Sequence, residues 1–192
     1  MSLVLIFGGW LVPAAVQGGF IPVRIGGDVP ADHGFLVPAF LTPLTATLVH
    51  GGFAHLALNL VMLVFCGRQV ERIVGPAGLV LLYVVGAIAG AAGQWAFEPH
   101  SSVPMIGASG AISAVVGVYA LLFGERRTKR WGPVSGDVLH VIWLAVAWIG
   151  IQFLVGLAGM GGVTVAIGAH IGGFVAGLVL ARPLLLWRYR QA

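Results

Sequence analysis

The chain has 192 residues, of which 59% are hydrophobic and 8% are charged, and it carries a formal net charge of +4. Soluble domains carry about 25% charged residues, so this composition excludes a soluble globular domain. A single cysteine excludes an internal disulfide bond. A nucleic-acid-binding surface is excluded as well, because no basic residues are interleaved with stacking aromatics on a polar face.

Six apolar segments are candidates for membrane-spanning helices, because about 20 residues cross the hydrocarbon core of a bilayer. Thirty glycines lie among these runs, which indicates helices packed closely through small residues. The sequence therefore predicts an all-α polytopic membrane protein with six transmembrane helices, forming one domain over residues 1–192. The predicted helices cover approximately residues 3–20, 44–66, 76–97, 108–124, 138–159 and 163–187.

The first segment is short and contains Pro13. It lacks the positively charged start of a signal peptide, and no soluble mature domain follows it. We therefore interpret it as a true first helix. A stretch rich in glycine and proline follows from Gly18 to Pro43, and its apolar residues predict that it lies in the outer membrane interface.

Basic residues gather on one side of the predicted bundle. By the positive-inside rule, this asymmetry predicts that both chain termini are cytoplasmic, and the basic loops are expected to contact anionic lipid. The opposite loops hold Arg24 alone. The residues on the basic side are Arg68, Arg72, Arg126, Arg127, Lys129, Arg130, Arg182, Arg188 and Arg190.

Four chemically capable side chains fall at one depth in this arrangement. Ser109 lies in the first turn of the fourth helix, and His170 lies about 10 Å into the sixth. His55 and Asn59 are four residues apart on the second helix, so they share one face. Ionisable groups inside a membrane are usually functional. The sequence therefore predicts a polar site in the outer half of the bilayer.

The fourth helix is too short to cross the bilayer from surface to surface. Residues 109–124 span about 24 Å, whereas the hydrocarbon core is about 30 Å thick. Residues 101–107 must then descend as irregular backbone, which is tolerated at depth where protein or water satisfies it. We therefore expect a water-filled cavity that opens outward, with Ser109 at its floor.

These residues can support nucleophilic catalysis. A serine hydroxyl attacks only when a base accepts its proton, and His170 is the best candidate for that base. The helix N-terminus at Ser109 offers backbone N–H groups to a developing oxyanion, to which His55 and Asn59 can add donors. Since no acidic residue lies at this depth on these helices, the site would be a dyad.

Each feature also has a purely structural interpretation. A lone Gly-x-Ser-Gly is common where membrane helices pack, and His55 with Asn59 could form interhelical hydrogen bonds. We interpret His100 and His140 as loop or interface residues. Cys66 has no neighbours at metal-ligand spacing, and neither a metal nor a cofactor is expected. The functional interpretation rests on the combination of groups at one depth.

The motifs together resemble those of the rhomboid intramembrane serine proteases. Three motifs match in order, and Gly67-Arg68-x2-Glu71-Arg72 resembles the family's second-loop signature. The resemblance covers nearly the whole chain. The matching motifs are His50-x4-His55-x3-Asn59, Gly107-Ala108-Ser109-Gly110-Ala111 and Ala169-His170-x2-Gly173-x3-Gly177.

The resemblance implies a serine endopeptidase that cleaves transmembrane proteins near the outer face of a bacterial inner membrane through an acyl-enzyme. It implies Ser109 as nucleophile and His170 as general base. His55, Asn59 and the Ser109 N–H would form the oxyanion hole. Gly173 and Gly177 would let the sixth helix approach the fourth, and His50 would be structural.

Two positions depart from the family pattern. Ser113 stands where some members have a tyrosine that stacks on the base, so something else must orient His170. The first loop also lacks the Trp-Arg pair of some members.

The outer part of the fifth helix, with Trp148, Gln152 and Phe153, is a plausible lateral gate for substrate.

Two other functions stay open at this point. A non-catalytic relative could bind transmembrane helices, although such proteins usually lack the serine or the histidine, and both are present here. A small transporter is the third hypothesis, but transporters commonly show inverted repeats, and the sequence has none. The sequence leaves the substrate and the oligomeric state open.

Overall fold

The computed structural model describes residues 1–26, 34–124, 133–157 and 166–190, with the backbone alone at 151–157. Its elements are helical, apart from one isolated bridge between Phe20 and Met105. The predicted all-α class is therefore confirmed for the described residues. The main helices are α1 (Ser2–Phe7), α2 (Leu11–Gly18), α3 (Thr42–Thr45), α4 (Phe53–Phe97), α5 (Ser109–Phe123), α6 (Gly136–Leu157) and α7 (Ile167–Arg188), and the short 3-10 turns are η1 (Pro22–Arg24), η2 (Ala39–Leu41) and η3 (Ala46–Leu48).

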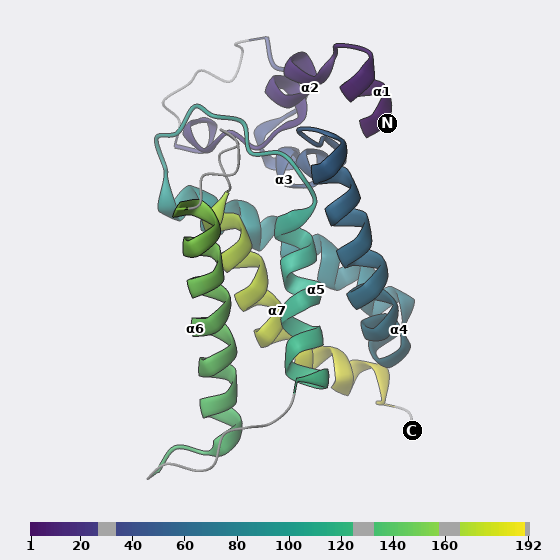
Figure 1. Cartoon of the computed structure of the whole chain (residues 1–192), viewed down its shortest axis with the longest axis vertical. Helices are drawn as coiled ribbons and strands as arrows, with labels where there is room; N and C mark the ends of the chain where they lie inside the picture. The colour runs from purple at the N-terminus through teal and green to yellow at the C-terminus, as the bar shows by residue number, and fades with distance from the viewer. Residues whose placement is uncertain (27–33, 125–132, 158–165, 191–192) are drawn as a thin grey trace.

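The N-terminal segment is not the single helix that we predicted over residues 3–20. It forms α1 and α2, of 6 and 8 residues, which are too short to cross a membrane. The break lies at Gly8-Gly9, where Gly9 adopts a φ of 74° that glycine tolerates without steric penalty. Both helices lie across one end of the bundle, above the start of α4 (Figure 1).

The second and third predicted helices are two arms of the bent helix α4. Gly75 has a φ of 79° and a ψ of 166°, which are not helical, and Pro76 follows it. Proline at the first position of a new helix is well tolerated, because its missing N–H would be unpaired there anyway. Each arm is roughly 33 Å long at 1.5 Å per residue, so each is long enough to cross the bilayer.

The second predicted helix begins later than expected. The sequence placed its start at residue 44, but residues 42–48 form α3 and η3, and α4 begins at Phe53. Gly51 and Gly52 separate the two parts. His50 therefore lies on a short connection, outside the long helix that carries His55.

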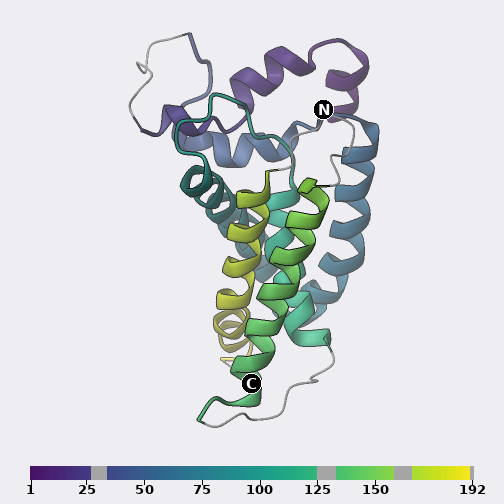
Figure 2. The same cartoon turned by 60° about the vertical axis from the view of Figure 1, so that its left-hand side comes forward.

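The two chain ends lie at opposite ends of the bundle. The N-terminus lies beside the start of α4, and the end of α7 lies at the far end (Figures 1 and 2). The two ends of a bundle that crosses a membrane face opposite sides. The prediction that both termini are cytoplasmic depended on a first spanning helix, and α1 and α2 are too short to supply one.

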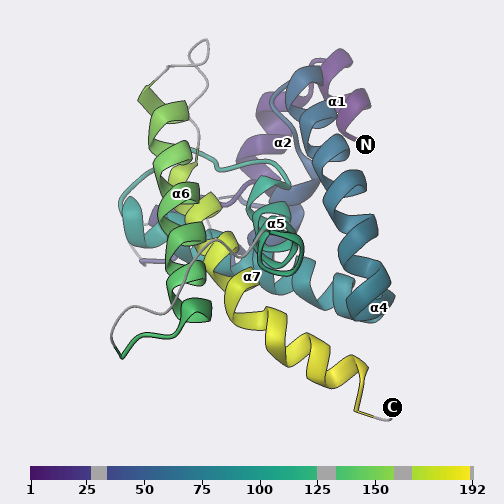
Figure 3. The same cartoon turned by 60° about the horizontal axis from the view of Figure 1, so that its bottom comes forward.

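Within the described residues, two helices are long and apolar enough to cross a membrane by length and composition, α4 and α7. The fourth predicted segment is short, as expected: α5 has 15 residues and begins at Ser109. It lies in the middle of the bundle, among α4, α6 and α7 (Figure 3). Nine consecutive residues of α5, from Gly110 to Val118, are buried.

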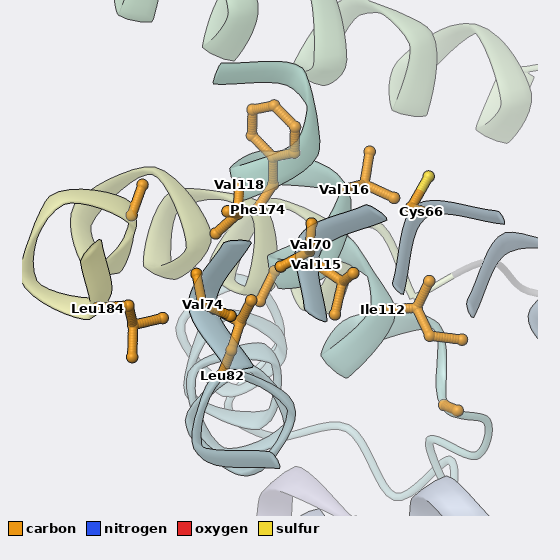
Figure 4. Close-up of a cluster of buried hydrophobic side chains, with 13 residues drawn as sticks. Cys66, Val70, Val74, Leu82, Ile112, Val115, Val116, Val118, Phe174 and Leu184 are labelled. Atoms are coloured by element: carbon orange, nitrogen blue, oxygen red, sulfur yellow. The ribbon is translucent and has the colours of Figure 1, made fainter. Parts of the chain in front are cut away.

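The apolar core joins both arms of α4 with α5 and α7. Its residues include Val70 and Leu82 on the two arms, Val115 on α5 and Leu184 on α7 (Figure 4). Cys66 lies in the same cluster and is 3% exposed, which agrees with its interpretation as a packing residue. The core therefore fixes α5 against its neighbours below the position of Ser109.

The elements before α4, which are α1, α2, α3 and η1 to η3, form an N-terminal layer. This layer binds the loop that precedes α5 through four backbone hydrogen bonds. Phe20 and Met105 exchange two of them, at 2.9 and 2.8 Å. The Val23 amide donates to the Ser101 carbonyl at 3.1 Å, and the Gly107 amide donates to the Ala46 carbonyl at 2.9 Å. This layer therefore holds the loop that leads into Ser109.

Candidate active site

Ser109 is the first residue of α5 and lies two residues after a glycine with a positive φ. Gly107 has a φ of 110°, in the region that favours glycine, and turns the chain into the helix. The first N–H groups of a helix have no partner within the helix. Because Ser109 lies at this N-terminus, those amides and the positive end of the helix dipole lie beside its hydroxyl.

His170 lies in the first turns of α7, and its side chain meets Ser109. The distance from His170 Nε2 to Ser109 Oγ is 2.7 Å, which is typical of a short, well-formed hydrogen bond. The two residues are 61 positions apart in the sequence. The predicted proximity of the serine and the histidine is therefore confirmed.

Glycines let α5 and α7 approach to backbone contact beside this pair. A Cβ atom added at Gly173 would overlap the Gly110 carbonyl oxygen, and one added at Gly177 would overlap the Ala114 carbonyl oxygen. A Cβ at Gly90, on the second arm of α4, would lie 3.1 Å from the Ala169 carbonyl oxygen. The three helices therefore meet through backbone atoms at the level of the pair.

His55 lies against the loop before Ser109. A Cβ atom on Gly107 would be 2.6 Å from both Cε1 and Nε2 of the His55 ring. The Gly51 amide donates to His55 Nδ1 at 3.3 Å, so the proton of the neutral ring is on Nε2. His55 therefore presents an N–H donor toward the loop that carries Ser109.

Asn59 is buried and lies one turn after His55. Its Nδ2 donates to the His55 backbone carbonyl at 2.8 Å, which leaves a second N–H of the same amide group for another acceptor. Among the hydrogen bonds of the described residues, Asn59 is joined to His55 and not to Ser109. The contacts of the described residues therefore place His55 against Gly107 and tie Asn59 to the His55 backbone.

Trp148 on α6 contacts the backbone of His170, which the sequence did not predict. Its Nε1 donates to the His170 carbonyl at 3.3 Å. Its ring stacks on Phe174 of α7, with centroids 5.0 Å apart and planes 10° apart. Ser113 stands at the position where some members of the resembled family have a stacking tyrosine, and its Oγ donates to the Ser109 carbonyl at 2.8 Å. Trp148 therefore fixes the turn of α7 that carries His170.

The other predicted positions have mixed outcomes. His50 is buried beside His55, with ring centroids 5.2 Å apart. His140 lies in the first turns of α6 and is 5% exposed, whereas His100 lies in an exposed turn, as predicted. The side chains of Gln152 and Phe153 lie outside the described part of the structure. Of the three residues of the predicted lateral gate, the structure therefore describes the side chain of Trp148 alone.

A small cavity lies beside Ser109. Its volume of about 10 Å³ is close to the space that one water molecule occupies. The lining residues are small or apolar apart from the Ser109 and Thr47 hydroxyls. They come from the N-terminal layer, the loop before α5, α4, α5 and the start of α7. They are Pro43, Thr47, Ala87, Met105, Ile106, Gly107, Ser109, Gly110, Ala111, Ala166 and Ala169.

Fold and site together define a helical membrane protein with a hydrogen-bonded serine and histidine near one end of its bundle. The rhomboid domain family matches residues 39–187 of the chain. This match covers α4 to α7 and both members of the pair. The chain therefore belongs to the rhomboid family, and it is an integral membrane protein.

Two curated relatives illustrate the similarity. The chain is 31% identical over 140 residues, 73% of its length, to rhomboid protease GluP of Bacillus subtilis (strain 168). It is 29% identical over 135 residues, 69% of its length, to rhomboid protease GlpG of Yersinia pestis (strain Pestoides F). The matched region covers 26% of GluP and 44% of GlpG, so the chain spans less than half the length of either relative.

Proposed function

We propose that this protein is an intramembrane serine endopeptidase that cleaves transmembrane protein substrates near the outer face of a bacterial inner membrane. The observation that carries the proposal is the 2.7 Å hydrogen bond between His170 Nε2 and Ser109 Oγ at the N-terminus of α5. A serine and a base within hydrogen-bonding distance are the signature of an activated nucleophile. The names of the curated relatives agree with this proposal.

The proposed reaction has two halves. Ser109 Oγ attacks the scissile carbonyl carbon while His170 Nε2 accepts the hydroxyl proton, and the tetrahedral intermediate collapses as His170 returns that proton to the leaving amine. Water then attacks the acyl-enzyme, with His170 again as base, and releases the acid product and free Ser109. The small cavity beside Ser109 could hold that water or a small substrate side chain.

The oxyanion in each tetrahedral intermediate would be stabilised by three sources of N–H donors. These are the backbone amides at the start of α5, the Nε2–H of His55 and the free N–H of Asn59. Donors that are already positioned contribute most in a site that excludes bulk water. His55 supports this role best, because its ring lies against Gly107.

The charges of the protein and its shape support the proposed orientation. Arg68, Arg72 and Arg188 lie at the end of the bundle away from Ser109, with the Arg188 side chain against Gly75. By the positive-inside rule this end is cytoplasmic, and the site then faces outward. In this proposal residues 1–192 act as one membrane domain, with lipid and the transmembrane segments of substrates as its partners.

Labelling with a serine-directed fluorophosphonate tests the proposal against its alternative, a non-catalytic protein that binds transmembrane helices. Ser109 Oγ is expected to displace fluoride and form a bond to phosphorus, while His170 accepts the hydroxyl proton. In His170→Ala the labelling rate should fall by about 10³-fold, because a positioned base contributes about 10²–10⁴-fold. The adduct is mapped by mass spectrometry. Folded wild-type protein without an adduct on Ser109 would favour the binder.

Trp148→Phe should lower the activity while leaving the protein folded. The substitution keeps an aromatic ring to stack on Phe174 but removes the Nε1–H that donates to the His170 carbonyl. Losing one hydrogen bond of about 1 kcal/mol corresponds to about fivefold, and we expect a loss of kcat of that order. Steady-state kinetics on a model transmembrane substrate measures it, and an unchanged kcat would exclude the positioning role of Trp148.

A further inference from the structure

His50 lies on the connection before α4 and depends on one hydrogen bond for its orientation. It is 5% exposed, and its Nδ1 lies 3.0 Å from Ser2 Oγ on α1. Its Nε2 is buried and has no hydrogen-bonding partner among the described residues. Among the described residues, Ser2 therefore provides the one hydrogen bond to the His50 ring.

The direction of that hydrogen bond follows from the second contact of Ser2. The hydroxyl also lies 2.7 Å from the Leu48 carbonyl and donates its only proton there, so it accepts a proton from His50 Nδ1. Burial, and to a lesser degree the neighbouring His55, lower the pKa of His50 to about 4. His50 is thus neutral near pH 7, with its proton on Nδ1.

His50 in turn borders His55. The two rings meet edge to face, with centroids 5.2 Å apart and planes at 67°. His55 is confined on its other sides by the Gly51 amide, which donates to Nδ1, and by Gly107. A shift of the His50 ring would therefore open space beside His55. The His55 ring could then rotate, and its Nε2–H would lose its fixed orientation.

We infer that Ser2 is a positioning residue of the proposed active site. Through His50 it holds His55 in the orientation that presents Nε2–H to the loop before Ser109. Ser2 touches neither member of the serine–histidine pair in the described contacts, so it acts through the two histidines. This inference rests on the proposed function, because His55 matters to the chemistry only if an oxyanion forms at Ser109.

A tether elsewhere in the N-terminal layer provides a matched control. Thr45 Oγ1 donates to the Gly18 carbonyl at 2.7 Å, so it also ties the N-terminal layer together through a side-chain hydroxyl. No contact between Thr45 and a histidine is present among the described interactions. Thr45→Val should therefore lower the Tm without changing kcat per active site, whereas a positioning role of Ser2 predicts a loss of kcat.

The test uses the full chain in proteoliposomes, with active sites counted by fluorophosphonate. Ser2→Ala is expected to lower kcat about tenfold with little change in KM, since small misplacements of catalytic groups can reduce rates by up to about 10²-fold. Ser2→Thr, which keeps the hydroxyl, should restore most of the rate. In a His55→Ala background, Ser2→Ala should cause no further loss, because its effect passes through His55.

The outcomes separate this inference from the proposed function. Ser2→Ala with the wild-type kcat, or with the same loss in the His55→Ala background, overturns the inference while the protease stands. Wild-type protein that neither cleaves nor labels at Ser109 overturns the proposed function and the inference with it. If Ser2→Ala does not fold, Ser2→Cys takes its place, since its thiol is a weaker acceptor, and a wild-type kcat in that variant is equally decisive.

Discussion

Replacing Ser109 by alanine is expected to abolish cleavage of a model transmembrane substrate while leaving the protein folded. In the proposed mechanism this hydroxyl forms the bond to the acyl group, so no other group of the site can take its place. Loss of a catalytic serine lowers kcat by about 10⁴-fold or more in soluble serine proteases. Cleavage is measured in proteoliposomes, and the Tm of the variant is compared with that of the wild type.

The Ser109→Ala variant should stay folded because few contacts depend on this hydroxyl. Ser109 Oγ bonds to His170 Nε2, whereas the backbone carbonyl of Ser109, which survives the substitution, accepts the hydrogen bond from Ser113. Ser113→Ala is a useful companion, since it removes a neighbouring hydroxyl that the proposed mechanism does not use. Undiminished cleavage by Ser109→Ala would exclude this serine as the nucleophile.

Gly173→Ala is expected to cause the second large effect, by separating the two helices that carry the pair. The added Cβ would overlap the Gly110 carbonyl oxygen, which belongs to the helix backbone and cannot rotate away. Forcing an extra methyl group into a packed interface costs about 1–3 kcal/mol. The resulting displacement of α7 would lengthen the 2.7 Å hydrogen bond, and we expect kcat to fall by about 10²-fold.

Gly150→Ala on α6 is the matched control for this change. A Cβ at Gly150 meets nothing within 4 Å, so the same chemical change is made in a helix without a collision. Alanine favours the helix over glycine by about 1 kcal/mol, and kcat should be unchanged. Thermal unfolding and fluorophosphonate labelling measure both variants. A Gly173→Ala protein with wild-type labelling would show that α7 can move without separating the pair.

The sequence predicted the helices that carry the site better than it predicted the N-terminal region. The fourth segment was predicted at 108–124 and is found at Ser109–Phe123, because glycine-bounded apolar runs mark helix ends clearly. Residues 3–20 form an apolar run of similar appearance. Hydropathy depends on composition alone. It therefore does not indicate that the helix ends at Gly8-Gly9, where the backbone changes direction.

The pairing of Ser109 with His170 could be predicted because it needed only residue type, helix order and depth. The contact of Trp148 with the His170 carbonyl could not, because it depends on which face of α6 meets α7. The contact of Ser2 with His50 was hidden for a different reason. It depends on α1 lying across the bundle, and the predicted first helix would have carried Ser2 to the other side of the membrane.

The four hydrogen bonds between the N-terminal layer and the loop before α5 make folding of the two regions interdependent. Phe20, Val23 and Ala46 supply partners for the backbone of Ser101, Met105 and Gly107. Until the layer docks, these groups must bond to water or stay unpaired, and each lost bond is worth about 1 kcal/mol. The loop that leads into Ser109 is therefore expected to become ordered together with the N-terminal layer, so a change that weakens the docking of that layer should also loosen this loop.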